Sequence, residues 1–128
     1  MIGNEIGSTP IHSAAYNGHF DILEFLCDFN EIPNAPNNRG DTPLHMAAYN
    51  GHLQIVKWLV ERRQASLTLN GIGGSTAIHA AAYNGHLEIV KFLMHFSETP
   101  NAPNNFGRTP SELARDQQFF EIAELLEK

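Results

Sequence analysis

The sequence has a single cysteine, few basic residues and no long apolar run. Cys27 is alone among 128 residues, so no disulfide can form within the chain. Only 8 lysines and arginines stand against 14 aspartates and glutamates, and this net charge of −6 argues against a nucleic-acid-binding surface. Residues 1–5 lack the basic start of a signal peptide, and no apolar stretch approaches the roughly 18 residues of a membrane span. These absences predict a soluble protein of the cytoplasm or nucleus, without nucleic-acid binding or membrane insertion.

What the sequence does contain is an internal repeat of about 33 residues. A Thr-Pro-Ile-His block and its variants begin at threonines that are 33, 34 and 33 residues apart, at positions 9, 42, 76 and 109. The block Ala-Ala-Tyr-Asn-Gly-His occurs unchanged at 14–19, 47–52 and 81–86. The block Pro-Asn-Ala-Pro-Asn-Asn occurs at 33–38 and 100–105. Because the blocks keep one phase, the chain is predicted to be a tandem array.

Each repeat has the chemistry of two short helices. Threonine before proline favours a helix start, because threonine caps a free N–H and proline is tolerated in the first helical turn. Asn17-Gly18 and its equivalents then provide a left-handed stop about two turns later. A second apolar pattern with helical spacing follows at 20–27, and the Asn/Pro/Gly-rich stretch 33–40 is typical of an extended turn. One unit is therefore predicted as helix, tight turn, helix and projecting turn.

Such units are stable only when they stack, so we expect a single domain over residues 1–128. The predicted repeats cover approximately 7–39, 40–73, 74–106 and 107–128. In the last repeat, Arg115-Asp116-Gln117-Gln118 replaces Ala-Tyr-Asn-Gly, and the tail is also polar. This favours a solubilising C-terminal cap at which the array ends. The segment before Gly7 is too short for another unit, which leaves open that the chain is cut from a longer array.

The stretch Gly40–Leu59 resembles the consensus of the ankyrin repeat at nearly every fixed position. The resemblance covers essentially the whole chain. It implies an all-α repeat solenoid, in which antiparallel helix pairs joined by β-hairpin-like fingers stack into a curved array with a concave face. It also implies a protein-binding scaffold that acts through the fingers and inner helices, without enzymatic activity or a cofactor.

The seven histidines raise the possibility of a metal site. Six of them occupy two equivalent positions of the repeat, one at residues 12, 45 and 79 and the other at residues 19, 52 and 86. Stacked helices lie roughly 8–10 Å apart, whereas zinc needs ligand nitrogens at about 2.0–2.1 Å. We therefore expect structural histidines that bond turns and backbone, and no metal.

Two further patterns suggest chemistry but favour an ordinary role. Gly71-Ile72-Gly73-Gly74 resembles a phosphate-binding loop, but it lacks the lysine and the βαβ context, and a loose finger is the better interpretation. Cys27 falls on the apolar side of a helix, where it is expected to be a small core residue.

Asparagines and phenylalanines near the fingers leave alternatives open. Asn34 and Asn101 match a position that asparaginyl hydroxylases modify in ankyrin proteins, but a turn-bonding role is favoured. Phe29 and Phe96 each precede a proline by four residues. Packing of Phe on Pro is favoured over a binding patch.

The predicted binding site centres on Tyr16, Tyr49 and Tyr83, which in ankyrin proteins face the concave groove. Tyrosine offers a large contact area with little loss of rotamer freedom, and it is enriched in binding hot spots. The rest of the predicted site consists of flanking asparagines and finger residues, namely Asn17, Asn50, Asn84, Ile6, Arg39, Asp41, Ile72, Phe106 and Arg108. The competing hypothesis is that duplication copied the tyrosines and that their rings only pack between inner helices.

The sequence therefore predicts a monomeric scaffold that binds an unidentified partner protein. Two alternatives stay open. The chain could be a regulatory module excised from a larger protein, such as an enzyme, a channel or a ligase adaptor. It could also be an engineered repeat protein without an evolved partner, which the verbatim repeats favour and the extra finger residue and Cys27 oppose.

Overall fold

The first helix of each repeat begins at the Thr-Pro block or its variant and ends at the Asn-Gly block or the residues that replace it. A computed structural model describes residues 10–28, 40–62 and 74–128. The predicted site residues Ile6, Arg39 and Ile72, together with Asn34, Phe29 and Pro33, lie outside the described residues. The helices of the described part are α1 (Pro10–Asn17), α2 (Phe20–Asp28), α3 (Pro43–Asn50), α4 (Leu53–Glu61), α5 (Ala77–Tyr83), α6 (Leu87–Met94), α7 (Pro110–Asp116) and α8 (Phe120–Leu126).

The predicted helix starts are confirmed as capping boxes. The Thr42 hydroxyl accepts from the backbone N–H of His45 at 3.4 Å, and the Thr42 N–H donates to Nδ1 of His45 at 3.0 Å. Thr76 caps α5 in the same way. At α7 the cap is Thr109, and the backbone N–H of Thr109 donates to the carboxylate of Glu112 at 3.0 Å. Each box satisfies helix-start donors that would otherwise have no partner.

The predicted left-handed stops are confirmed as well. Gly18, Gly51 and Gly85 have φ of 78°, 81° and 77°, a region in which a Cβ is strained. The fourth helix pair has Gln118 at the same phase, and it takes a φ of 68°. The short turn after each first helix brings the second helix back antiparallel to it.

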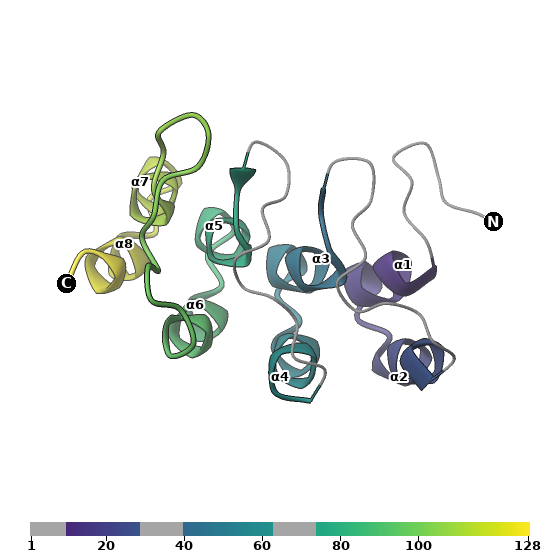
Figure 1. Cartoon of the computed structure of the whole chain (residues 1–128). Coiled ribbons are helices and arrows are strands. Elements are labelled where there is room, and N and C mark those ends of the chain that lie inside the picture. Colours follow the sequence, from purple (N-terminus) through teal and green to yellow (C-terminus); the bar gives the residue numbers. More distant parts are fainter. Residues whose placement is uncertain (1–9, 29–39, 63–73) are drawn as a thin grey trace.

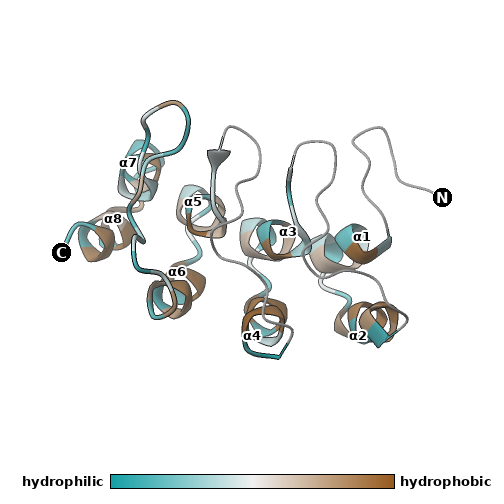
Figure 2. Ribbon diagram, in the orientation of Figure 1, coloured by the Kyte–Doolittle hydropathy of each residue, from teal (hydrophilic) through white to brown (hydrophobic). Residues whose placement is uncertain are grey.

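The helix pairs stack side by side to build the core (Figure 1). We call α1, α3, α5 and α7 the inner helices and the other four the outer helices; each inner helix packs on the next inner helix and on its own outer helix. The core lies between the two rows. The inner helices supply alanines at 0–3% exposure, and the outer helices supply larger side chains such as Val56, Leu59 and Leu93 at 0%. Figure 2 shows that each helix carries both apolar and polar residues, as expected for helices with one buried face. The predicted all-α repeat solenoid is confirmed.

The segment between α6 and α7 forms a projecting finger whose tip is a tight turn (Figure 1). The Asn104 N–H donates to the carbonyl of Arg108 at 2.8 Å, and the Gly107 N–H donates to the carbonyl of Asn104 at 3.0 Å. These bonds give the finger a hairpin-like end, although the described residues contain no strand. The finger brings Phe106 and Arg108 to the side of the inner helices.

Candidate functional site

The three predicted tyrosines lie at the ends of successive inner helices, where they are equally exposed. Tyr16, Tyr49 and Tyr83 have exposed fractions of 43%, 44% and 43%. No hydrogen bond joins any of their hydroxyls to another residue of the described part. The rings are therefore not sealed between the helices, and each presents a ring surface and a polar tip to solvent. We call this surface the tyrosine face.

The backbone beneath the tyrosine face is fixed by histidines of the following helix pair. Nε2 of His52 lies 2.9 Å from the carbonyl oxygen of Tyr16, and Nε2 of His86 lies 3.0 Å from that of Tyr49. Sequence reasoning expected these histidines to bond local turns and backbone. The structure shows instead that they reach back 36 and 37 residues, to the preceding helix pair. Each bond couples the orientation of one tyrosine to the next helix pair.

Phe119 stands where a fourth histidine of this kind would be. Its ring lies against Gly85, where an added Cβ would come within 2.6 Å of Cζ. Phenylalanine has no N–H to donate, so Tyr83 cannot receive the bond that Tyr16 and Tyr49 receive. Tyr83 therefore lacks the histidine bond that couples Tyr16 and Tyr49 to the next helix pair.

The three flanking asparagines already use their amide nitrogens inside the protein. Asn17 and Asn84 donate to backbone carbonyls four residues earlier, at 3.0 and 3.2 Å. Asn50 instead donates to the carbonyl of Tyr16 at 2.7 Å, across the junction between helix pairs. Each of these bonds uses one of the two N–H donors of the amide, and in the described part no donor occupies the Oδ1 atoms, so a second N–H and the Oδ1 of each asparagine stay available for the donor and acceptor contacts predicted from sequence.

Arg108 does not extend the site as a free cation. Its guanidinium forms an ion pair with Asp116, the residue at the tyrosine phase of the fourth helix pair. The row of three tyrosines thus ends in an ion pair. Asp41, the finger residue of the second pair, is half-buried, and its carbonyl lies 3.1 Å from Nε2 of His12.

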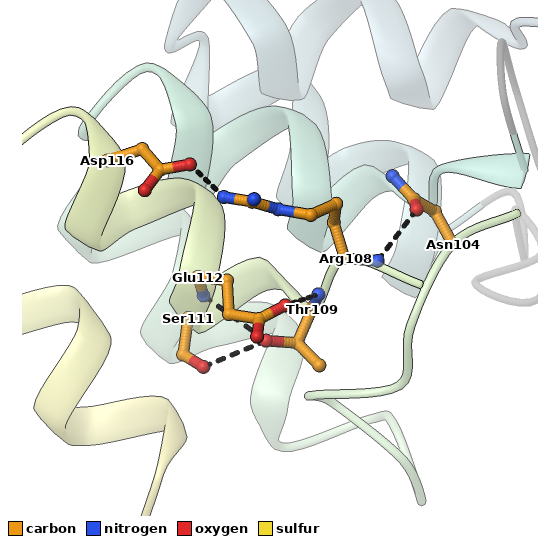
Figure 3. A network of polar contacts seen from close by, with 6 residues as sticks. All are labelled: Asn104, Arg108, Thr109, Ser111, Glu112 and Asp116. Carbon is orange, nitrogen blue, oxygen red and sulfur yellow. Dashed lines mark hydrogen bonds and ion pairs between the residues drawn. The ribbon is translucent and has the colours of Figure 1, made fainter. Parts of the chain in front are cut away.

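Phe106 lies in the turn at the tip of the finger, and Asn104 holds that turn. Oδ1 of Asn104 accepts from the N–H of Arg108 at 3.0 Å (Figure 3). The same atom accepts from the N–H of Phe106 at 2.9 Å. Nδ2 of Asn104 donates to the hydroxyl of Ser75 in the preceding finger at 3.3 Å. With 78% of its surface exposed, Phe106 is the most exposed large apolar residue of the described part. The structure therefore places an aromatic side chain on a rigid support beside the tyrosine face.

The capping-box histidines bond to the backbone of the next finger. Nε2 of His45 lies 3.2 Å from the carbonyl of Ser75, and Nε2 of His79 lies 3.0 Å from that of Arg108. Across the described residues no group of three or more His, Cys, Asp or Glu side chains could hold a metal ion. Glu112 completes the capping box of α7, where the earlier helices have histidine.

Burial makes His79 a source of pH-dependent stability. Desolvation lowers the pKa of His79 below its ordinary value of 6.5, and repulsion from a charged His45 lowers it further. The hydrogen bond to the Arg108 carbonyl raises the pKa and offsets part of this change. Because the unfolded chain binds this proton more readily, the free energy of unfolding should fall as pH drops below about 6.5. We expect the midpoint of thermal unfolding to decrease from pH 7.5 to pH 5.5, with a smaller slope in His79→Gln. An unchanged slope in that variant would contradict this role.

The remaining sequence-based interpretations have mixed outcomes. Cys27 is 7% exposed and packs in the core, as expected. Oδ1 of Asn101 accepts from the N–H of Ser111 at 2.9 Å, a backbone-bonding role at the start of α7. Phe96 is 48% exposed and contacts Phe92 at a centroid distance of 5.0 Å. Its predicted packing on Pro100 stays a prediction.

Among the helices within residues 10–28, 40–62 and 74–128, none has both the length and the apolar character needed to cross a bilayer.

Comparison with protein families agrees with the geometry. A family model described as ankyrin repeats in three copies matches residues 1–71. A second, described as ankyrin repeats in many copies, matches residues 59–114. No curated protein matches the chain.

Proposed function

The chain belongs to the ankyrin-repeat family, and from this premise we propose that it is a protein-binding scaffold whose tyrosine face and fingers engage a partner protein. Ankyrin repeats are generally protein-interaction modules and typically not enzymes. The proposal assigns the chain no catalytic activity and no cofactor. Because Cys27 is the only cysteine and forms no disulfide within the chain, we place this function in the cytoplasm or nucleus.

The equal exposure of Tyr16, Tyr49 and Tyr83 carries the proposal. Rings that only packed between inner helices would be buried, whereas these keep 43–44% of their surface accessible. Their backbone is already ordered, and two of them are held by histidine bonds, so little conformational entropy is lost on binding. Ordered, half-exposed tyrosines are typical of binding hot spots.

The surroundings indicate what kind of partner surface fits. The Arg108–Asp116 pair closes one end of the tyrosine row, so the face has no unbalanced charge there. Phe106 projects from the adjacent finger and suits a small apolar pocket. We therefore expect a partner that is recognised by area and shape, with hydrogen bonds at the asparagine amides, and not by long-range attraction to one sign of charge.

Affinity capture from the native host, followed by titration of each recovered protein, tests the proposal. The variant Tyr16→Ala/Tyr49→Ala/Tyr83→Ala should bind the true partner at least ten-fold more weakly, because hot-spot truncations cost about 2 kcal/mol or more. Phe120→Ala is the matched control: it removes an aromatic that is 52% exposed on the outer helix α8 and should bind normally. Unchanged affinity of the folded triple variant for every recovered protein would refute the tyrosine face as the binding site.

A further inference from the structure

His45 joins two peptide groups that belong to successive repeats. Its Nδ1 accepts from the backbone N–H of Thr42 at 3.0 Å, and its Nε2 lies 3.2 Å from the carbonyl oxygen of Ser75. A neutral imidazole has one N–H and one bare nitrogen. Because the Thr42 N–H can only donate and the Ser75 carbonyl can only accept, the ring proton of His45 must be on Nε2. The geometry therefore fixes both the tautomer of His45 and the direction of its two hydrogen bonds.

His79 repeats this arrangement one helix pair later. Its Nδ1 accepts from the N–H of Thr76 at 3.0 Å, and its Nε2 donates to the carbonyl of Arg108 at 3.0 Å. The Ser75 carbonyl and the Thr76 N–H are the two ends of one peptide group. His45 thus donates to the same peptide group that donates to His79, so the hydrogen bonds of the two histidines are linked in series and point the same way.

The series continues in both directions along the inner helices. Nε2 of His12 lies 3.1 Å from the carbonyl oxygen of Asp41, in the peptide group whose N–H bonds His45. At the other end, the peptide group that accepts from the last histidine donates its own N–H, that of Thr109, to the carboxylate of Glu112 at 3.0 Å (Figure 3). Every bond in the series points toward that carboxylate. We call the series the histidine row, which consists of the peptide groups 41–42, 75–76 and 108–109 and the side chains of His12, His45, His79 and Glu112.

The histidine row requires neutral imidazoles, and a second proton on His79 breaks it at one defined point. That proton would sit on Nδ1, where two donors, Nδ1–H and the backbone N–H of Thr76, would then face each other. The Thr76 hydroxyl, 3.0 Å from Nδ1, can accept the new proton, but the Thr76 N–H is left without its acceptor. On the other side, the charged ring binds the Arg108 carbonyl more strongly, because a hydrogen bond from an ionised donor is stronger. Protonation therefore opens the capping box of α5 and keeps the bond to the next finger.

The capping box of α5 lies beside a contact that supports Phe106. The peptide group 75–76 includes the carbonyl of Ser75, and the hydroxyl of Ser75 accepts from Nδ2 of Asn104 at 3.3 Å. Oδ1 of Asn104 accepts in turn from the N–H of Phe106 at 2.9 Å. Linked hydrogen bonds strengthen one another, so the loss of one bond weakens its neighbours. A displacement of the peptide group 75–76 is therefore expected to reach the finger tip that carries Phe106.

The charges on the elements packed against α5 set the pH at which His79 takes up its proton. These elements are α3, α6 and α7. Burial lowers the pKa of His79, and the charge of His45 on α3 lowers it further. The charged side chains of α6 and α7 bond other groups, namely Glu88 with Lys91, Asp116 with Arg108, Arg115 with Glu127 and Glu112 with the Thr109 N–H. His79 is therefore neutral at pH 7 and is protonated only below the ordinary histidine pKa of about 6.5.

We propose that the histidine row is an acid-operated switch of the partner-binding surface, in which protonation of His79 opens the capping box of α5 and loosens the support of Phe106. The neutral row fixes the finger bases at 41–42, 75–76 and 108–109 to the inner helices. The protonated row leaves the tip at Phe106 displaced, so affinity for the partner should fall in mildly acidic solution. This inference rests on the proposed function, because the position of Phe106 matters only if the fingers bind a partner.

NMR spectra and amide hydrogen exchange of the isolated chain between about pH 7.5 and about pH 5 test the switch. At the higher pH, His79 should carry its proton on Nε2. As the ring titrates, the amide resonances of Thr76 and Phe106 should shift with the same midpoint. The protection factor of the Thr76 N–H should fall about ten-fold, as expected for one lost hydrogen bond. The amide of the buried Leu59 should keep its protection, which separates local opening from unfolding.

Two variants separate the steps of the switch. His79→Gln is the matched control, because glutamine completes a capping box and does not titrate. In this variant the Thr76 N–H should keep its protection over the whole pH range. Ser75→Ala removes the hydroxyl that bonds Asn104, so Thr76 should still respond to pH whereas Phe106 should not.

Three results would overturn the proposal: a proton on Nδ1 of neutral His79, amides of Thr76 and Phe106 that do not follow its titration, or a His79→Gln variant that responds like the wild type. If His79→Gln does not fold, the wild type and Ser75→Ala decide, since Phe106 must follow pH in the first and not in the second. None of these measurements involves a partner. A failure of the tyrosine face as binding site would therefore leave their outcome unchanged.

Discussion

Replacing Ile55 by aspartate is expected to unfold the chain, whereas the same change at Ile22 leaves it folded. The two residues hold the same phase of the repeat, but Ile55 is 2% exposed and Ile22 is 51% exposed. Losing a buried isoleucine costs about 2–5 kcal/mol, and an unpaired carboxylate in the same place adds a large desolvation cost. Small domains have only about 5–15 kcal/mol of total stability, so the loss at Ile55 exceeds or exhausts it. At Ile22 the change should stay within about 1 kcal/mol.

Urea unfolding followed by circular dichroism measures the difference. Ile89→Asp should behave like Ile55→Asp, because Ile89 holds the same phase of the repeat and is also 2% exposed. Ile55→Val is the conservative control and should cost about 0.5–1.5 kcal/mol. Equal losses at Ile22 and Ile55 would mean that Ile22 is covered in solution, contrary to its exposed position in the structure.

The parts of the fold that the sequence predicted are those decided by local chemistry. Thr42 and Thr76 cap helices because a hydroxyl three residues before a free N–H satisfies it in any context. The stop at Gly51 follows from the positive φ that glycine adopts without strain. The register of the stack then follows, because burying the apolar phase of each outer helix allows only one arrangement of neighbours.

The parts of the site that were missed depend on partners about one repeat away. Asn50 and Asn84 stand in identical sequence blocks, yet Asn50 donates to the preceding helix pair and Asn84 donates to its own helix. Local sequence cannot separate these outcomes, because the choice depends on small differences in how neighbouring pairs sit. The bond from His52 to the carbonyl of Tyr16 was missed because the sequence does not show which backbone groups of the preceding helix pair lie within its reach.

The pairing of Arg108 with Asp116 could have been anticipated. Asp116 breaks the tyrosine pattern at the only repeat whose finger has an arginine at that phase, and opposite charges at facing positions are a usable signal. Taken one at a time, Arg108 was predicted as a finger residue of the binding face and Asp116 as part of the polar cap. Their combination is what ends the tyrosine row.

Replacing Gly51 by alanine should destabilise the chain more than the same change at Gly107. Both glycines have positive φ, 81° and 77°, so both substitutions meet left-handed strain of about 1–2 kcal/mol. They differ in what the new Cβ meets. At Gly51 it would lie 2.6 Å from Cε1 of His86, whereas at Gly107 nothing lies within 4 Å. The imidazole of His86 must move, which breaks its bond to the carbonyl of Tyr49, a loss of about 1 kcal/mol in addition.

A double-mutant cycle isolates this contact from backbone strain. We expect Gly51→Ala to cost about 2–3 kcal/mol and Gly107→Ala about 1–2 kcal/mol in urea unfolding. In a His86→Ala background the extra cost at Gly51 should disappear, because the ring that the Cβ would meet is gone. Equal costs for the two glycines in the wild-type background would show that His86 yields freely. In that case the histidine bond does not fix the backbone of Tyr49, and the low entropic cost assigned to the tyrosine face loses its physical basis at that position.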